Sequence, residues 1–247
     1  MTVFRSLAAA ALLFSSMPAL ALTDADKDEV RAVIKDYLIK NPEIIEEALN
    51  ELKRKQEEGE ASAAKAAIAQ NAAAIFHAEG DLVLANPKGK ITMVEFFDYN
   101  CGYCKRALPD VLKLMESDGD VRVVMKEFAI LGPGSVFAAR AALASRKQGR
   151  YADFHLALMK HDGRHDEQSV MAIAAELGLD TEALKRDMDA TDVASVLAAN
   201  AALAESLNIS GTPAFIIDQT LIPGAVGVDS LMTAVKDVRD AGGCKSC

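Results

Sequence analysis

The chain has 247 residues, of which 51% are hydrophobic, and this excludes a wholly disordered protein. The 36 acidic residues outnumber the 27 basic ones, and the net charge of −9 argues against binding to nucleic acid or anionic lipid. Four cysteines are too few to build a disulfide scaffold in a chain of this length, so we expect them to have chemical roles.

The first 21 residues have the features of a secretory signal peptide. Arg5 supplies a positive start, residues 7–14 are apolar, and residues 19–21 (ALA) match a cleavage site of small residues. An uncleaved membrane anchor is the alternative, but the apolar run is shorter than the roughly 18 residues of a spanning helix. We therefore expect a mature protein in the periplasm, where oxidising conditions favour disulfide chemistry.

Residues 22–78 are predicted to form three helices. Apolar side chains recur at helical spacing over residues 30–52 and form one stripe. Residues 53–67 contain no large apolar side chain, which is typical of an exposed helical stalk. The apolar stripe packs either against the rest of the chain or against copies of itself. Because the polar stalk separates it from the main domain, we favour an oligomerisation element, and hence a homo-oligomer.

Residues 79–241 are predicted to form one α/β domain. Strands are expected at residues 82–84, 91–98, 121–128, 214–218 and 221–223, and helices at residues 101–116 and 229–240, with a helical insertion at about 135–208. The nearly continuous apolar run of residues 91–98 is typical of a central strand that is buried on both faces. The strand–helix–strand order around it predicts parallel strands joined by a right-handed crossover.

Two cysteines form the motif Cys101-Gly102-Tyr103-Cys104, where the central strand ends and a helix begins. Unpaired N–H groups and the helix dipole at this position stabilise a thiolate, so the pKa of Cys101 is expected to be low. A low pKa is what the nucleophile of disulfide exchange requires, and Cys104 is placed to resolve a mixed disulfide. An inert structural disulfide and half of a zinc site are the alternatives.

Two charged residues are expected near this motif. Glu95 shares a strand face with Met93 and Phe97, so we expect its carboxyl to be buried beneath the cysteines. Burial raises a carboxyl pKa and would let Glu95 relay a proton to or from Cys104. Lys126 in the neighbouring strand is expected to pair with Glu95, because buried charges need partners. An exposed pair of charges at the sheet edge is the alternative.

The stretches VEFFDYNCGYCKRALP, KEFAILGPGS and SGTPAFII resemble the DsbA-like branch of the thioredoxin superfamily, over residues 80–241. Residues 22–78 resemble the N-terminal helical region of ScsC-type thiol oxidoreductases, named for suppression of copper sensitivity. The resemblance implies a thioredoxin fold with a helical insertion and a redox-active disulfide that needs no cofactor. It also implies exported client proteins and a membrane redox partner that recharges the dithiol.

The resemblance also assigns roles to particular residues. Cys101 would be the exposed nucleophile and Cys104 the buried resolving thiol. Pro213 would be a cis-proline facing the disulfide, and Thr212 would offer backbone hydrogen bonds to an extended substrate peptide. An X–Pro bond just before a strand is a position where a cis bond can be held, although most X–Pro bonds are trans.

The dipeptide between the active-site cysteines departs from DsbA, which has Pro-His there. Gly102 and Tyr103 provide no cation beside Cys101, so the pair is expected to be a weaker oxidant. Gly-Tyr, and Thr before the proline, are similar to the DsbC-type isomerases. Several active sites held around one client would suit an isomerase. We therefore expect an isomerase or reductase, with a DsbA-type oxidase as the alternative.

The second cysteine pair, Cys244 and Cys247, ends the chain. Two glycines precede it, so residues 242–247 are predicted to be a flexible tail. Three interpretations are open: a disulfide without function, an accessory dithiol that exchanges electrons with the active site, and a clip for Cu(I) or zinc. The resemblance to ScsC gives Cu(I) some weight, and a copper-handling protein is the alternative from another functional class.

Three histidines lie close together in sequence. His155, His161 and His165 lack the spacing of a metal-binding motif and are expected to be exposed to solvent. No other metal site is expected, and no nucleotide-binding, serine-hydrolase or zinc-protease motif is present in the sequence.

Overall fold

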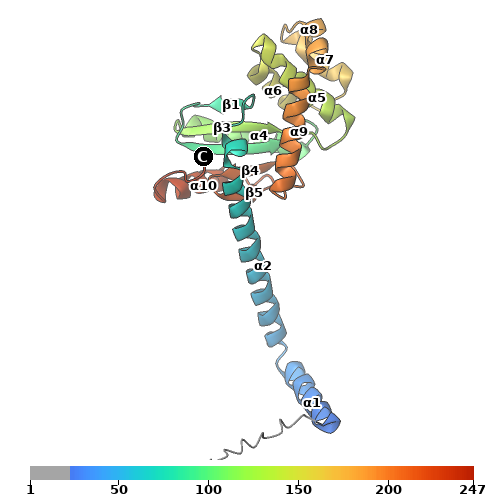
Figure 1. Ribbon diagram of the computed structural model, residues 1–247, viewed down its shortest axis with the longest axis vertical. Helices are drawn as coiled ribbons and strands as arrows, with labels where there is room; N and C mark the ends of the chain where they lie inside the picture. Colours follow the sequence, from blue (N-terminus) through green and yellow to red (C-terminus); the bar gives the residue numbers. More distant parts are fainter. Residues whose placement is uncertain (1–22) are drawn as a thin grey trace, which may run out of the picture. The chain divides into compact units, whose positions relative to one another are not determined.

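The computed structural model describes residues 23–247, which belong to two compact units, Met1–Gln56 and Glu57–Cys247 (Figure 1). The expected signal peptide lies outside the described residues. Among the helices that the structure describes, none is long and apolar enough to span a bilayer.

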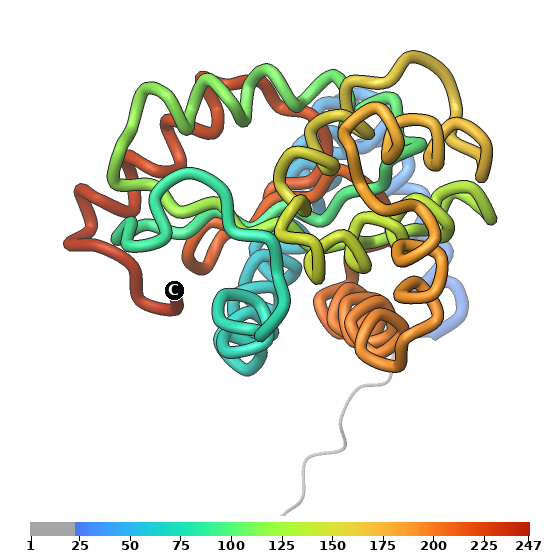
Figure 2. The backbone as a smooth tube through the Cα atoms, turned by 90° about the horizontal axis from the view of Figure 1, so that it is seen from above, coloured from blue at the N-terminus to red at the C-terminus, as the bar shows by residue number. Residues whose placement is uncertain are grey.

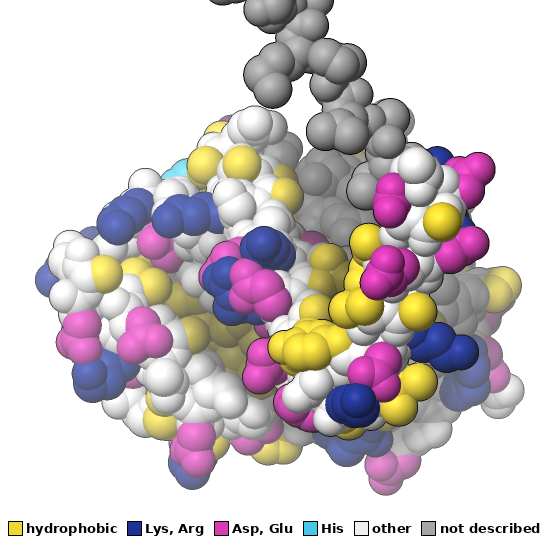
Figure 3. Space-filling view, turned by 90° about the horizontal axis from the view of Figure 1, so that it is seen from below, with side chains coloured by type: hydrophobic (Ala, Val, Ile, Leu, Met, Phe, Trp, Pro, Cys, Tyr) yellow, Lys and Arg dark blue, Asp and Glu magenta, His cyan; other side chains and the backbone are white. Residues whose placement is uncertain are grey.

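Three helices form at the N-terminal end, as the sequence predicts. They are α1 (Asp24–Lys40), α2 (Glu43–Gln70) and α3 (Ala72–Phe76). A capping box starts α1, because Thr23 Oγ accepts from the Asp26 N–H while the Asp26 carboxylate accepts from the Thr23 N–H. Most of the predicted apolar stripe is exposed in the single chain, from 48% at Val30 to 63% at Val33, while Leu38 and Ile44 are half-buried. Exposed hydrophobic side chains are also visible in Figure 3.

The second unit is built on a five-stranded sheet with the order β1-β3-β2-β4-β5. The strands are β1 (Leu82–Ala85), β2 (Ile91–Phe97), β3 (Val121–Glu127), β4 (Ala214–Ile217) and β5 (Thr220–Pro223). β2 and β3 are parallel and are joined through α4 (Gly102–Ser117), while the other neighbours pair antiparallel. The predicted strand–helix–strand unit is therefore confirmed.

Helices cover both faces of the sheet. The remaining ones are α5 (Pro133–Ala144), α6 (Tyr151–Lys160), α7 (Glu167–Glu176), α8 (Thr181–Met188), α9 (Thr191–Ser206) and α10 (Val228–Asp240), with a short 3-10 helix at Ser145–Gln148. α4 and α10 lie side by side on one face, and α3 and the C-terminal half of α9 lie on the other (Figure 2). All seven residues of β2 are buried between these two layers. The expected α/β class and helical insertion are confirmed.

The predicted pairing of Glu95 with Lys126 is wrong. In the parallel register of β2 and β3, Glu95 lies beside Met125, whereas Lys126 lies beside Phe96. Because successive side chains of a strand point to opposite faces, the two charges lie on opposite sides of the sheet. Lys126 Nζ instead contacts Asp81 Oδ2 and the Ala74 carbonyl, both at 2.6 Å.

The compact second unit begins earlier in the chain than the expected residue 79. Ile68, Ile75 and Phe76, from the end of α2 and from α3, are buried against the sheet together with Val94 and Phe96. Hence only residues up to 56 fall outside this unit, and residues 57–78 include part of its core.

The C-terminal tail differs from the predicted flexible segment. Cys244 and Cys247 form a disulfide and are half-buried, and each packs against a hydrophobic core cluster. The N–H groups of Lys245 and Ser246 donate to Asp218 Oδ1 at 2.8 and 2.7 Å. The tail is docked because the turn between β4 and β5 places the Asp218 carboxylate beside it. These partners are 27 residues apart in the chain, so the local sequence could not predict the contact.

Candidate active site

The turn between β2 and α4 is fixed by Asp98, a residue that the sequence analysis did not single out. Its Oδ1 accepts from the Asn100 N–H at 2.7 Å, and its carbonyl accepts from the Cys101 N–H at 3.0 Å. Its Oδ2 accepts from the N–H groups of Ile130 and Leu131 at 2.8 and 3.0 Å. The tendency of Asp to bond the backbone two residues ahead was the available sequence signal.

Cys101 lies at the N-cap of α4, as the motif predicts. Its Sγ accepts from the Cys104 N–H at 3.3 Å, and its thiol donates to the Thr212 carbonyl at 3.2 Å. In the ionised form, hydrogen bonds from the side chains of Cys104 and Thr212 and from the backbone N–H groups of Cys104 and Tyr103 stabilise the sulfur, and they lower the pKa of Cys101 to about 5 although burial opposes this. A sulfur in this position is a thiolate at neutral pH.

Cys101 is less accessible than the expected exposed nucleophile. Only 5% of its surface is exposed, because the segment that carries Thr212 covers the sulfur. Cys104 is fully buried, and both sulfurs are free thiols in the structure. Burial, the hydrogen bond to Cys101 and the charge of Glu95 raise the pKa of Cys104. The two thiols are therefore tuned in opposite directions, as nucleophile and resolving group require.

Glu95 is 2% exposed, consistent with the strand face on which the sequence places it. Burial and the charge of Cys101 raise its pKa to about 8. Within residues 23–247 the salt bridges do not include Glu95, so no cation offsets its burial. A carboxyl that titrates near neutral pH and interacts with Cys104 has the properties of a proton relay, a role that stays a prediction.

A pocket of about 410 Å³ lies beside the cysteine motif. The Thr212–Pro213 peptide bond is cis, and both residues line this pocket together with Tyr103, Leu221 and Gly224. Tyr103 is 61% exposed. The Arg106 guanidinium lies 4.1 Å from its ring centroid. The pocket thus brings Tyr103, Thr212 and Pro213 to one surface.

The prediction of solvent-exposed histidines is wrong for His155 and His165, which are 0% and 3% exposed. The insertion packs onto the sheet, so that His155 Nδ1 lies 3.1 Å from Tyr99 Oη and His165 Nε2 lies 2.9 Å from the Leu158 carbonyl. Burial lowers their pKa values to about 3 and about 4, so both rings are neutral at physiological pH. His161 is half-buried.

A second buried glutamate, Glu127, escaped the sequence analysis. Its Oε1 accepts from Tyr99 Oη at 2.9 Å and from Tyr151 Oη at 2.8 Å, while its carbonyl accepts from Asn200 Nδ2 at 3.1 Å. Burial raises its pKa to about 8. This residue ties β3 to α6 and α9 of the insertion. The sequence feature that could have identified Glu127 was its position in a mostly apolar strand, which predicts a buried carboxyl.

The two cysteine pairs lie at opposite ends of β2. Cys101 follows the carboxyl end of the strand, whereas Cys247 Sγ accepts from the N–H of Thr92, near the strand's amino end. A strand of seven residues separates them by roughly 20 Å. Direct disulfide exchange between the two pairs of one chain is therefore excluded in this conformation.

Comparison with known proteins agrees with this geometry. Residues 92–236 match the DSBA-like thioredoxin domain, and residues 26–58 match the copper resistance protein ScsC N-terminal domain. A thioredoxin-like oxidoreductase from Silicibacter pomeroyi is 49% identical, with a TM-score of 0.67 over 68% of this chain and 97% of that one. A linker-deletion mutant of Proteus mirabilis ScsC is 31% identical, with a TM-score of 0.69 over 91% of this chain and all of that one.

Curated proteins with similar sequences include disulfide bond formation protein D of Bacillus subtilis, which is 26% identical over 170 residues, 64% of this chain and 77% of that protein. Na⁺/H⁺ antiporters NhaA also match, and the chain spans about a quarter, 24%, of the length of the one from Salinispora arenicola. The domain match covers more than half of the chain and includes both active-site cysteines. The chain therefore belongs to the DSBA-like thioredoxin domain family of thiol–disulfide oxidoreductases and carries an ScsC-type N-terminal region.

Proposed function

We propose that this protein is an exported disulfide isomerase and reductase that acts on other exported proteins. The observation that carries the proposal is the pair of thiols at the start of α4. Cys101 is held as a thiolate, and Cys104 is held as a thiol directly behind it. This is the arrangement that disulfide exchange through a mixed disulfide needs.

The reaction begins when the Cys101 thiolate attacks one sulfur of a client disulfide. That S–S bond breaks, a mixed disulfide forms, and the second client sulfur leaves as a thiolate. In isomerisation, another client thiolate attacks the client sulfur of the mixed disulfide, which restores the Cys101 thiolate. In reduction, Cys104 attacks Cys101 Sγ instead, and the client leaves with two thiols. A membrane redox partner then supplies two electrons to the Cys101–Cys104 disulfide.

Glu95 is proposed to carry the proton in the reductive branch. Cys104 must lose its proton before it attacks, and its raised pKa opposes that loss. A buried carboxyl with a pKa of about 8 can accept a proton and return it within the same pH range. Glu95 therefore acts as a proton relay, while Lys126, on the other face of the sheet, takes no part.

The pocket beside the cysteines is proposed to hold the client. Pro213 and Tyr103 give it apolar walls, and the neighbouring Thr212 backbone lies against the Cys101 sulfur. An extended peptide laid along Thr212 would bring its disulfide to Cys101 through main-chain hydrogen bonds. Such contacts depend little on client sequence, which suits an enzyme with many clients.

The N-terminal helices are the reason to favour isomerisation over oxidation. Their apolar stripe is exposed in the single chain, and a homo-oligomer would bury it. Several active sites in one assembly raise the local concentration of thiolates around a client that is held at one site. Repeated exchange on one client is what isomerisation requires.

A copper-related role in the cell is consistent with this proposal. Copper ions promote thiol oxidation, and the N-terminal region matches the domain of a copper resistance protein. An isomerase would repair the wrong disulfides that result. A strain without this gene should then grow poorly in elevated copper, and the wild-type gene should restore growth. The Cys101→Ala gene should fail to restore growth, because the proposed role depends on thiol–disulfide exchange.

The test of the proposed activity uses scrambled ribonuclease with the wild type, Cys101→Ala and Cys104→Ala. We expect the wild type to restore ribonuclease activity and Cys101→Ala to lose this effect. Cys104→Ala should keep part of the ability to restore ribonuclease activity, because a client thiol can resolve the mixed disulfide. Mixed disulfides between Cys101 and the client should accumulate in this variant. An oxidase would instead speed disulfide formation in reduced ribonuclease and leave the scrambled form unchanged, which would overturn the isomerase assignment.

A further inference from the structure

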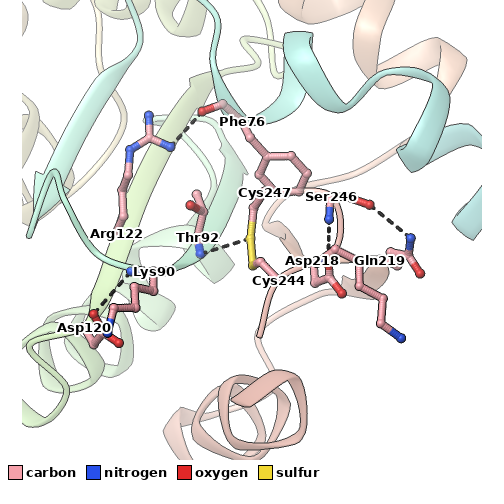
Figure 4. Close-up of a disulfide and its surroundings, with 11 residues drawn as sticks. Phe76, Lys90, Thr92, Asp120, Arg122, Asp218, Gln219, Cys244, Ser246 and Cys247 are labelled. Atoms are coloured by element: carbon pink, nitrogen blue, oxygen red, sulfur yellow. Dashed lines mark hydrogen bonds between the residues drawn. A yellow bond between two sulfur atoms is a disulfide. The ribbon is translucent and has the colours of Figure 1, made fainter. Parts of the chain in front are cut away.

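The C-terminal tail, residues 242–247, forms a loop that four hydrogen bonds hold in place (Figure 4). Two of them join the N–H groups of Lys245 and Ser246 to Asp218 Oδ1 at 2.8 and 2.7 Å. The others run from Gln219 Nε2 to Ser246 Oγ at 3.1 Å and from the Thr92 N–H to Cys247 Sγ at 3.4 Å. The loop is therefore preorganised on the turn between β4 and β5.

This docking brings three metal-binding atoms together. The sulfurs of Cys244 and Cys247 and a carboxylate oxygen of Asp218 all lie within 4.8 Å of one another. Asp218 is only 7% exposed, and the salt bridges of the described part of the chain do not include it. Both hydrogen bonds of this carboxylate go to Oδ1, and within the described residues Oδ2 has no hydrogen bond, so it is free to bind a ligand. Asp218 therefore offers the cluster one carboxylate oxygen.

We propose that, once a dithiol reductant has passed two electrons to the Cys244–Cys247 disulfide and become a disulfide itself, the two resulting thiols release their protons and bind one Zn²⁺ ion together with Asp218. Zinc takes sulfur at about 2.3 Å and carboxylate oxygen at about 2.0–2.2 Å, which places tetrahedral ligand atoms about 3.5–3.8 Å apart. The three atoms lie within 4.8 Å of one another in the disulfide form, and breaking the S–S bond lets the two sulfurs move apart to this spacing. Both cysteines are half-buried, so water can take the fourth position.

The donor set favours zinc over Cu(I), the two ions that the sequence leaves open for this cysteine pair. Two thiolates and one carboxylate carry three negative charges, of which Zn²⁺ neutralises two and Cu(I) only one. Cu(I) is a soft ion that prefers the two sulfurs and would leave the Asp218 oxygen unused. Zinc accepts sulfur and oxygen ligands in one site. The contribution of Asp218 therefore distinguishes the two ions.

The test uses the full chain with Cys101→Ser and Cys104→Ser, so that the active site cannot bind metal. The protein is reduced with a phosphine, freed of reductant without oxygen, and titrated with Zn²⁺ against a chromophoric chelator. We expect about one zinc ion per chain, and loss of that ion when Cys244→Ser and Cys247→Ser are added. Because the active-site thiols are absent, the result is independent of the proposed isomerase activity.

Asp218→Asn is the decisive variant, because asparagine keeps an oxygen for the loop N–H groups but loses the charge. We expect zinc affinity to fall at least about tenfold in Asp218→Asn, since even indirect contacts to a metal ligand are commonly worth that much. Asp120→Asn is the control: this carboxylate also accepts a backbone hydrogen bond, from the Lys90 N–H, but it is not part of the cluster. It should leave the affinity unchanged.

Cobalt provides a spectroscopic readout that leaves the three residues of the cluster unchanged. Co²⁺ in the reduced protein with Cys101→Ser and Cys104→Ser should give the thiolate charge-transfer and intense visible bands of a tetrahedral site with sulfur ligands, and oxidation of Cys244 and Cys247 should abolish them. Unchanged zinc affinity in Asp218→Asn would overturn the proposal. So would zinc binding no tighter than that of the variant without the tail cysteines, or binding of Cu(I) alone.

Discussion

Two sulfurs in one helical turn are held in different protonation states by their positions alone. Cys101 receives hydrogen bonds at the start of α4, which stabilise its thiolate. Cys104 is fully buried, bonds to Cys101 and lies near the charge of Glu95, so its neutral form is favoured although the Asp98 backbone also bonds to it. The difference in pKa between nucleophile and resolving thiol therefore follows from the helix terminus, from burial and from the nearby Glu95 carboxyl.

The first prediction concerns the pH dependence of Cys101. Its pKa of about 5 means that the rate of alkylation by iodoacetamide should rise to half of its maximum near pH 5 and be constant above about pH 7. In Cys104→Ala the hydrogen bond from the Cys104 thiol is missing, so the midpoint should move to higher pH. Mass spectrometry of the reduced protein measures both curves. A midpoint near that of free cysteine would contradict the proposed nucleophile.

At the scale of elements, the sheet separates two buried charged sites. Glu95 and Glu127 point to the face covered by α4 and the insertion, and Lys126 points to the face covered by α3 and α9. Lys126 finds Asp81, just before β1, as its partner at 2.6 Å. Alternation along two adjacent strands therefore keeps the structural ion pair apart from the redox chemistry.

The second prediction concerns this ion pair. Lys126→Met leaves Asp81 as a buried carboxylate without its cation, and should lower the free energy of unfolding by about 3–5 kcal/mol. Replacing both residues, as Lys126→Met with Asp81→Leu, should recover most of that loss because no charge then remains buried. Urea unfolding measures each variant. Equal losses in the single and double variants would show that the pair contributes through packing alone.

The third prediction concerns Glu127, which joins β3 to the insertion. Its folded pKa of about 8 exceeds the ordinary value of 4.5, so the folded state keeps a proton that the unfolded state loses. The stabilisation is present below pH 4.5 and is lost as the pH rises to about 8. In that window the wild type should lose stability relative to Glu127→Gln by up to about 1.4 kcal/mol per pH unit. Urea unfolding of both proteins at several pH values measures the difference.

At the scale of the whole molecule, the chain consists of two units with different surfaces. Residues 57–247 have their own core and the complete cysteine site, whereas the helices before them expose their apolar side chains. The boundary lies inside α2, so a truncation that respects the second unit must stop at residue 56. Removing residues up to 78 would also remove the buried Ile68, Ile75 and Phe76.

The fourth prediction concerns truncation at that boundary. A protein without residues 1–56 should be a folded monomer that still oxidises dithiols but has less isomerase activity, since single active sites no longer act together. Removing residues up to 78 should instead lower stability by several kcal/mol, because three large buried side chains are lost. Light scattering and thermal unfolding measure these outcomes. A full-length protein that is already monomeric would contradict the role assigned to the N-terminal helices.

The sequence by itself determined the local features of this protein. The apolar run of β2, the cysteine at a strand–helix junction and the helical spacing of residues 30–52 each depend on neighbours in the chain, and the structure shows all three. The spacing of apolar residues along the chain predicts which face of a helix or strand is apolar.

Only the tertiary structure decided which faces meet. The register of β2 and β3 separated Lys126 from Glu95, and the packing of the insertion buried His155 and His165. The turn after β4 placed Asp218 beside cysteines 26 and 29 residues further along the chain, although the two glycines before Cys244 predicted a flexible tail. Periodicity gives the direction of a side chain within its own element, whereas partners distant in sequence are fixed by strand register and by how layers pack.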